Sequence, residues 1–336
     1  MGQKQRVYPI LFLCILLILE LSGCKDTASP VTRTGFYFDT VVQITLYDDR
    51  KENLIDDCFK MAENFEKLVS KTVEGSEIYD LNHAKGAPVI MSEETLDLLE
   101  AGLYYCQLSE GAFDITIGAL AQLWDIKNNP GMTPSESDIS AALSGVGYEN
   151  ISIKGNEVTL ANPGTQLDLG AIAKGYIADR MKDYLNECGV REGIINVGGN
   201  VLVLGPKADG SPYVIGIQRP FSTEGTAMYS VEITDGTVVS SGVYERYFEK
   251  DRIIYHHILN PVSGYPYQNG LLSVTIFCPE SVDGDGLSTT CFSLGLEKGM
   301  ALIESIPDAE AVFITEDYEL AASSGMGTKI PYHVLE

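Results

Sequence analysis

Residues 167–176 read LDLGAIAKGY, and they join a predicted strand to a long amphipathic helix over 171–188, which Gly189 ends. After this helix the chain is mostly predicted strand, over 193–197, 201–204, 213–217, 228–233, 237–240, 245–249, 253–258 and 271–277. Because strands outnumber helices and follow one another along the chain, the pattern predicts an α+β fold rather than a doubly wound parallel sheet.

The segments on either side supply the remaining elements. We predict a strand over 36–47, helices over 52–69 and 92–108, and a third apolar segment over 115–124. Residues 126–137 are rich in Asn, Pro, Gly and Ser, which predicts a surface loop. Short strands near 151–153 and 158–160, a helix near 287–306 and terminal strands complete the chain.

The first residues have the pattern of an export signal. Lys4 and Arg6 precede an apolar run over 7–19, which is short for a membrane span of about 20 residues, and the run leads to LSGC at 21–24. This pattern predicts a lipoprotein signal peptide over 1–23, an acylated Cys24, a polar tether over 24–34 and a folded domain over 35–336. The alternative is an ordinary signal peptide or membrane anchor that contains a cysteine. The expected location is the outer side of the cell membrane.

Composition excludes some classes of function. The formal net charge is −24, which argues against nucleic acid as a partner because its phosphates would be repelled. The same charge would not draw the chain to anionic lipid, so a membrane attachment would be covalent. Beyond Cys14 and Cys24, the cysteines have no C-x-x-C spacing and predict neither a disulfide framework nor a zinc site. The chain beyond the tether is long enough for one large domain or two intimate ones.

The opening stretch also has features of a phosphate site. Gly170 and Ala171 let a ligand approach the backbone, and a helix N-terminus offers free N–H groups and partial positive charge. Lys174, about one turn into the helix, can reach a phosphate oxygen, and Asp168 can accept hydrogen bonds from a base or ribose. A plain capped helix with a surface lysine is the alternative. Residues 196–200, NVGGN, likewise indicate either a hairpin turn or close contact with a ligand.

Residues 283–290, DGDGLSTT, place a carboxylate and a hydroxyl on one helix face. An EF-hand is rejected because Phe292 stands where the loop needs a bidentate Glu. Asp285 and Thr289 are four residues apart and would share a helical face. Hard oxygen ligands suit Mg²⁺ when substrate phosphate completes its coordination. The alternative is an N-cap with hydroxyls.

Two of the four histidines are adjacent, at His256 and His257. Neighbouring residues on a strand point to opposite faces, so we expect one histidine to be structural and the other to face a cleft. A neutral imidazole is the usual proton acceptor in catalysis.

In order and spacing, these segments resemble the ApbE family of FAD:protein FMN transferases, which are usually bacterial lipoproteins. The segments that carry the resemblance are GAFD at 111–114, LW at 123–124, DLGAIAKGY at 168–176, NVGG at 196–199, SSGVYER at 240–246, HHI at 256–258 and DGLST at 285–289. The resemblance covers 36–304 and implies an ApbE-like α+β fold, related to the T-fold, with mixed sheets packed against helices.

The resemblance also implies roles for individual residues. FAD would be contacted by Phe38, Ala112, Phe113, Asp114, Asp168, Lys174 and Leu259. A magnesium ion would be held by the backbone carbonyl of Ala171, the side chains of Asp285 and Thr289, and a backbone oxygen of Ser288. His257 would be the catalytic residue.

Two segments depart from the family pattern. The family often has Met-Gly-Thr near its first strand, where this chain has Phe38-Asp39-Thr40. It also often has an aromatic residue that covers the flavin, whereas residues 70–78 here read SKTVEGSEI. The resemblance therefore does not extend to how the flavin ring is covered.

The implied reaction is phosphoryl transfer, with AMP released as FMN passes from FAD to a Thr or Ser hydroxyl of an acceptor protein. Expected acceptors are exported or membrane redox proteins that carry Asp-x-x-Ser/Thr-Gly-Ala-Ser/Thr. The chain's own nearest match, DITIGA at 114–119, lacks the acceptor hydroxyl, so we expect no self-modification. The alternatives are an FAD pyrophosphatase that gives FMN and AMP, and a non-catalytic FAD-binding lipoprotein.

Overall fold

The computed structural model describes residues 29–223 and 225–335. The predicted signal peptide and the predicted lipidation site at Cys24 lie outside these residues. Among the residues that are described, no helix combines the length and apolar character needed to cross a membrane.

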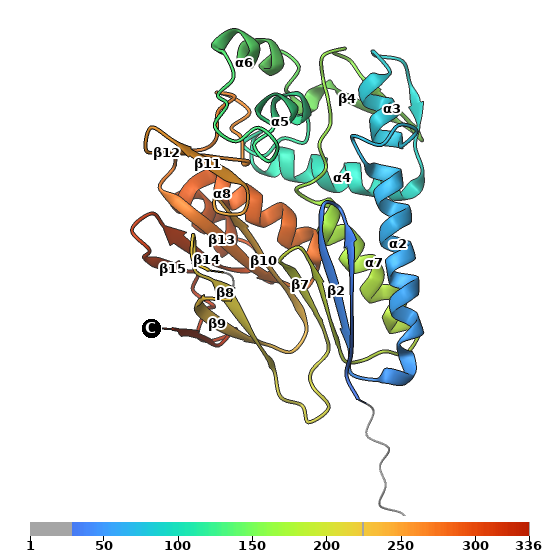
Figure 1. Cartoon of the computed structure of the whole chain (residues 1–336), viewed down its shortest axis with the longest axis vertical. Helices are drawn as coiled ribbons and strands as arrows, with labels where there is room; N and C mark the ends of the chain where they lie inside the picture. The colour runs from blue at the N-terminus through green and yellow to red at the C-terminus, as the bar shows by residue number, and fades with distance from the viewer. Residues whose placement is uncertain (1–28, 224, 336) are drawn as a thin grey trace, which may run out of the picture.

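The main element is an eight-stranded sheet in which every neighbouring pair of strands is antiparallel (Figure 1). From one edge to the other its strands are β1 (Val31–Tyr37), β2 (Thr40–Leu46), β6 (Gly193–Val197), β7 (Asn200–Leu204), β10 (Gly236–Gly242), β13 (Leu271–Cys278), β14 (Glu310–Thr315) and β15 (Leu320–Ala322). The alternation of buried and exposed residues on β2 shows that one face of the sheet is covered.

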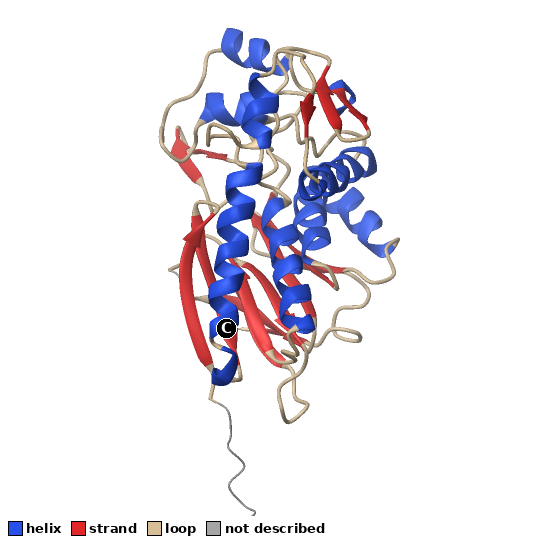
Figure 2. Ribbon diagram, turned by 90° about the vertical axis from the view of Figure 1, so that its right-hand side faces the viewer, coloured by secondary structure: helices blue, strands red, loops and turns tan. Residues whose placement is uncertain are grey.

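Three long helices cover that face, α2 (Asn53–Val69), α7 (Ala173–Glu187) and α8 (Ser281–Glu304), as Figure 2 shows. Helix α7 packs between α2 and α8, and α8 lies against β10 and β13. The close approach of α7 to α8 depends on Gly175, because a Cβ there would lie 2.7 Å from the Cα of Val282. Helix α8 bends at Gly295, whose φ is 79°.

The shorter elements surround this core. Two three-stranded sheets are formed by β8 (Tyr213–Gln218), β9 (Ala227–Ile233) and β16 (Tyr332–Val334), and by β3 (Val89–Ile90), β5 (Glu157–Leu160) and β4 (Ile151–Lys154). A hairpin is formed by β11 (Tyr247–Lys250) and β12 (Ile253–His256). The helices are α3 (Glu77–His83), α4 (Glu93–Leu108), α5 (Gly118–Trp124) and α6 (Glu136–Leu143), with the short helices η1 (Asp49–Lys51) and η2 (Tyr148–Asn150). Helices α3 to α6 stand at one end of the large sheet (Figure 1).

A second, smaller core joins α5 and α6 to the β11–β12 hairpin. It is formed by Leu120, Trp124, Ile126, Ile139, Phe248 and Leu259. The indole N–H of Trp124 donates to the carbonyl of Gly264 at 2.7 Å, which ties the loop after β12 to α5. The α+β architecture predicted from the sequence, with mixed sheets packed on helices, is therefore confirmed, and it is built on two adjoining cores.

Four local predictions need correction. Residues 36–47 form no single strand, because Phe38 and Asp39, at φ 53° and 62°, make the two-residue turn between β1 and β2. Strand β1 starts at Val31, so the last residues of the predicted tether belong to the sheet. Residues 167–169 are in no strand, since the side chain of Asn82 takes the backbone hydrogen bonds of Leu167.

The fourth correction concerns helix starts. Helix α7 begins at Ala173 rather than 171, so Lys174 lies in its first turn. Helix α8 begins at Ser281, six residues before the predicted start. The carboxylate of Asp179 on α7 accepts the backbone N–H groups of Ser281 and Val282 at 2.7 and 2.8 Å, and it thereby caps α8 from a distant part of the sequence.

Candidate active site

A cleft of about 1090 Å³ opens where the end of the large sheet meets α5 and the β11–β12 hairpin. Eleven of the twelve residues predicted for FAD, metal or catalysis line it: Phe38, Ala112, Phe113, Asp114, Asp168, Ala171, Lys174, His257, Leu259, Asp285 and Thr289. The structure therefore brings together residues that are far apart in the sequence.

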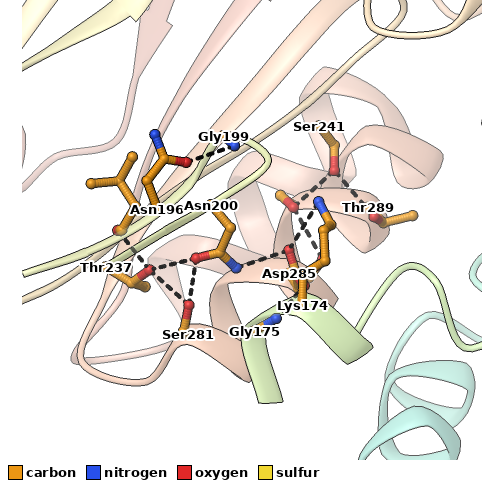
Figure 3. Close-up of polar contacts among 12 residues, drawn as sticks. Lys174, Gly175, Asn196, Gly199, Asn200, Thr237, Ser241, Ser281, Asp285 and Thr289 are labelled. Carbon is orange, nitrogen blue, oxygen red and sulfur yellow. Dashed lines mark hydrogen bonds and ion pairs between the residues drawn. The ribbon is translucent and has the colours of Figure 1, made fainter. Parts of the chain in front are cut away.

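Asp285 is the most deeply buried acidic residue that lines the cleft, with 3% of its surface exposed. One carboxylate oxygen accepts the backbone N–H of Gly175 at 2.7 Å, and the other accepts the amide of Asn200 at 3.1 Å (Figure 3). The Lys174 ammonium lies 4.0 Å from the carboxylate. Burial raises the pKa of Asp285, while Lys174, the Gly175 N–H and Asn200 act in the opposite direction. The carboxylate is thus held in one orientation by donors on two sides.

The orientation of Asn200 is itself fixed. Its side-chain oxygen accepts the hydroxyl of Ser281 at 2.5 Å, and Thr237 lies 3.5 Å from the same oxygen (Figure 3). With that oxygen occupied as an acceptor, the amide nitrogen must face Asp285. The position of the carboxylate therefore depends on α7, α8, β7 and β10 together.

Three hydroxyls lie beside this carboxylate. Ser241 on β10 contacts the hydroxyls of Ser288 at 2.8 Å and Thr289 at 3.1 Å. Asp285 and Thr289 share one face of α8, as their spacing predicts, and both line the cleft (Figure 3). Ser288 is fully buried and outside the cleft lining, and its hydroxyl donates to the carbonyl of Asp285 at 3.0 Å. Its side chain positions α8 rather than facing a ligand.

The oxygen donors at this point are few. Within 29–223 and 225–335 no cluster of three or more His, Cys, Asp or Glu could hold a metal ion. Asp285, Thr289 and Ala171 nevertheless present a carboxylate, a hydroxyl and a backbone segment to the same cleft. Such a sparse set of hard oxygens fits Mg²⁺, which keeps waters and takes substrate phosphate oxygens as ligands. The residues present are thus compatible with a magnesium ion shared with a phosphate ligand.

Asp168 makes another ion pair within the cleft. Its carboxylate lies 2.5 Å from the ammonium of Lys71 and accepts the backbone N–H of Gly170 at 3.0 Å. Burial alone would favour the neutral acid, but Lys71 and the Gly170 N–H outweigh it, so the pKa of Asp168 lies below its usual value. An ionised Asp168 can only accept hydrogen bonds, which suits a ligand that presents N–H or O–H groups.

The two adjacent histidines have separate environments, as expected. His256, the last residue of β12, is 2% exposed, and its Nε2 lies 2.8 Å from the carbonyl of Tyr267. Burial lowers the pKa of His256 to about 4, so it is a neutral structural residue.

His257 follows the end of β12 and lines the cleft. Its Nδ1 lies 3.4 Å from the carbonyl of Arg246, so Nδ1 carries the hydrogen and Nε2 keeps a free lone pair. Desolvation by the protein around the cleft, together with the nearby His256 and Arg246, lowers the pKa of His257 below its usual value. A neutral imidazole with a free Nε2 is able to accept a proton.

The remaining predicted contacts also line the cleft. Asp114 is 8% exposed, and its carboxylate accepts the N–H groups of Thr116 at 2.8 Å and Tyr148 at 3.0 Å. Protein donors therefore already occupy both of its oxygens, and its clearest role is to hold this loop. Leu259 belongs to the smaller core, and Phe38, in the β1–β2 turn, donates its backbone N–H to Glu66 at 2.7 Å.

The paired glycines of residues 196–200 form the tight turn between β6 and β7. Gly198 and Gly199 have φ values of 59° and 92°, and the Asn196 side chain accepts the Gly199 N–H at 2.9 Å (Figure 3). A Cβ on Gly198 would lie 2.9 Å from the Cβ of Thr40. Gly198 also lines the cleft, so the hairpin turn and the approach to a ligand are both features of this segment.

Comparison with known proteins adds to this geometry. A family model described as the ApbE family matches residues 38–313. The chain belongs to the ApbE family. A relative from Klebsiella pneumoniae named FAD:protein FMN transferase is 39% identical over 276 residues, which are 81% of this chain and 85% of that protein. One of the same name from Treponema pallidum is 32% identical and covers 94% and 93% of the two chains.

Solved structures agree with this family assignment. The crystal structure of an ApbE protein from Thermotoga maritima has a TM-score of 0.81 and 30% identity, covering 88% of this chain and 97% of that one. The flavin transferase ApbE from Vibrio cholerae has a TM-score of 0.79 and 28% identity, covering 88% and 98%.

Three cationic residues of this ApbE-family cleft have no role that the sequence predicted. Lys71 lies in the loop where the family often has an aromatic residue, Lys127 follows α5, and Arg246 is the last residue of the SSGVYER segment; all three line the cleft. The only sequence signal for Lys71 was the departure of its loop from the family pattern. Its pairing with Asp168, 97 residues away, is visible only in the folded chain.

Proposed function

We propose that this protein is an FAD:protein FMN transferase that moves FMN from FAD to a Thr or Ser hydroxyl of an acceptor protein and releases AMP. The observation that carries the proposal is that Asp285, Lys174 and His257, whose Nε2 is free, line the same cleft. The names of the relatives support the same reaction.

The reaction is a phosphoryl transfer at the FMN phosphorus of FAD. The acceptor oxygen forms a bond to this phosphorus as the bridging P–O bond of the pyrophosphate breaks, and the electron pair leaves on the AMP phosphate. His257 accepts the hydroxyl proton on Nε2. Lys174 and the N-terminal N–H groups of α7 stabilise negative charge on the phosphate oxygens.

We further propose that Asp285, Thr289 and the Ala171 carbonyl hold a magnesium ion together with the pyrophosphate. A cation there would neutralise charge on the leaving phosphate. The support is the buried, oriented carboxylate of Asp285 beside the Thr289 hydroxyl. Asp168, Phe38, Ala112, Phe113 and Leu259 are proposed as contacts to the nucleotide on the other walls of the cleft.

The location of the enzyme is also a proposal. The apolar run and the LSGC sequence at 21–24 support a lipid anchor on Cys24 and a position on the outer side of the membrane. Acceptors would then be exported or membrane redox proteins with the Asp-x-x-Ser/Thr-Gly-Ala-Ser/Thr pattern.

The decisive experiment incubates the mature, unlipidated protein with FAD, Mg²⁺ and an acceptor domain, and follows acceptor mass and released nucleotide together. We expect the acceptor to gain one FMN, and both chelation and Asp285→Ala to abolish this gain. His257→Ala should retain FAD binding and lose transfer by about a hundredfold or more. Asp308→Ala and His333→Ala, at exposed positions outside the cleft, serve as matched controls.

The other outcomes select among the alternatives. FMN and AMP with an unmodified acceptor would indicate an FAD pyrophosphatase. Intact bound FAD would indicate a carrier. Full transfer by His257→Ala would remove that residue from the mechanism.

A further inference from the structure

The outward face of the β1–β2 hairpin changes character along its length. Directly paired residues of antiparallel strands place their side chains on the same face. On the face turned away from the core, the successive pairs are Thr32 with Thr45, Thr34 with Gln43, and Phe36 with Val41. The two pairs farther from the turn are polar, and the pair next to the turn is apolar.

Packing in the protein core does not explain why Phe36 and Val41 are apolar. Phe36 is 66% exposed and Val41 is 52% exposed, whereas Val42 and Ile44 on the opposite face of β2 are completely buried. An exposed cross-strand pair stabilises a hairpin only slightly, so the hairpin itself does not require these two side chains to be apolar.

The pair also lies at the rim of the cleft. Phe36 itself lines the cleft, as do Phe38, Asp39 and Thr40 of the turn. The backbone N–H of Gly198 donates to the carbonyl of Val41 at 2.9 Å. The glycine turn at 198–199, of which Gly198 lines the cleft, therefore lies directly beside Val41.

We propose that Phe36 and Val41 form a docking surface for the acceptor protein. The inference rests on the proposed transfer, because a protein substrate must cross the rim of the cleft to bring its hydroxyl to His257. Among the described residues the Phe36–Val41 pair is where the exposed face of β1–β2 becomes apolar, and it does so at that rim. The partner chemistry it fits is an apolar side chain near the target hydroxyl. Val41 is the member of the pair that lies outside the lining of the cleft proposed to hold FAD.

The test compares Val41→Lys with Gln43→Lys. Both positions are exposed on the same face of β2, but Gln43 is two residues farther from the turn, and neither lines the cleft. We expect Val41→Lys to raise the KM for the acceptor domain about tenfold while the KM for FAD and the melting temperature stay unchanged. Gln43→Lys should leave both KM values unchanged. Val41→Thr, which keeps the branched shape, should give a smaller rise and guards against a folding defect.

The other possible results would refute the docking surface, and they show whether the proposed function fails with it. Equal acceptor KM values for Val41→Lys and wild type, with transfer intact, would refute the docking surface alone. No transfer by wild type to any acceptor would refute the proposed function first. The pair would instead contact a second copy of this chain if Val41→Lys changed only the oligomeric state in gel filtration. It would contact lipid if the variant changed only cosedimentation of the mature protein with phosphatidylglycerol vesicles.

Discussion

Gly175 is the residue whose replacement tests how α7 and α8 build the site. Its backbone N–H donates to Asp285 at 2.7 Å, and its lack of a side chain lets α7 lie against the start of α8. A Cβ at this position would lie 2.7 Å from the Cα of Val282 and closer still to the carbonyl of Ser281. Because both obstacles are backbone atoms, no side-chain rotation can relieve the contact. Gly175→Ala must therefore push the two helices apart.

The size of the effect follows from two opposing contributions. Overpacking a closely packed core costs about 1–3 kcal/mol, and replacing glycine by alanine inside a helix returns up to about 1 kcal/mol. Backbone obstacles favour the upper end of that cost, so we expect a net loss of about 2 kcal/mol in the free energy of unfolding. The donor to Asp285 moves with α7, and a hydrogen bond to a charged group contributes about 1.5–3 kcal/mol, so transfer should fall at least about tenfold.

Urea unfolding measures the first effect, and the rate of FMN transfer measures the second. Gly164→Ala is the matched control, because its Cβ would meet nothing closer than the Asn162 side chain at 3.4 Å. It should leave both quantities near those of the wild type. A Gly175→Ala protein within about 0.5 kcal/mol of wild type and fully active would refute the packing argument.

Two further predictions concern charge in and near the cleft. Lys71→Ala removes the partner of Asp168 and should raise the KM for FAD severalfold with little change in kcat. Lys71→Arg should keep the KM near that of the wild type, and Lys67→Ala, on the surface of α2, should have no effect. An unchanged KM for Lys71→Ala would show that the ion pair does not affect FAD binding. His256, with its pKa lowered from 6.5 to about 4 by burial, takes up a proton in the unfolded chain before the folded one. The free energy of unfolding, measured by denaturation, should therefore fall by up to about 3 kcal/mol as the pH drops from 6.5 to 4. In His256→Gln this contribution to the pH dependence of the free energy of unfolding should be lost. The same pH dependence in the variant and the wild type would contradict the prediction.

Local sequence patterns predicted the helices and strands that interactions between nearby residues determine. The apolar spacing of 52–69 and 92–108 gave α2 and α4 within one residue at their ends, and Ser92 caps α4 by accepting the N–H of Thr95 at 3.3 Å. The β1–β2 hairpin was missed because Phe38 and Asp39 adopt positive φ without a glycine to announce the turn. The start of α8 was missed because its cap, Asp179, comes from α7.

The sequence by itself determined which residues share an element and a face. The four-residue spacing of Asp285 and Thr289 put a carboxylate and a hydroxyl on one side of a helix, and the adjacent positions of His256 and His257 separated a structural histidine from one that lines the cleft. Only the tertiary structure decided what those faces meet. Asn200 and Gly175 reach Asp285, and Lys71 reaches Asp168, because packing of α2, α7 and α8 on the sheet joins segments that local spacing cannot relate.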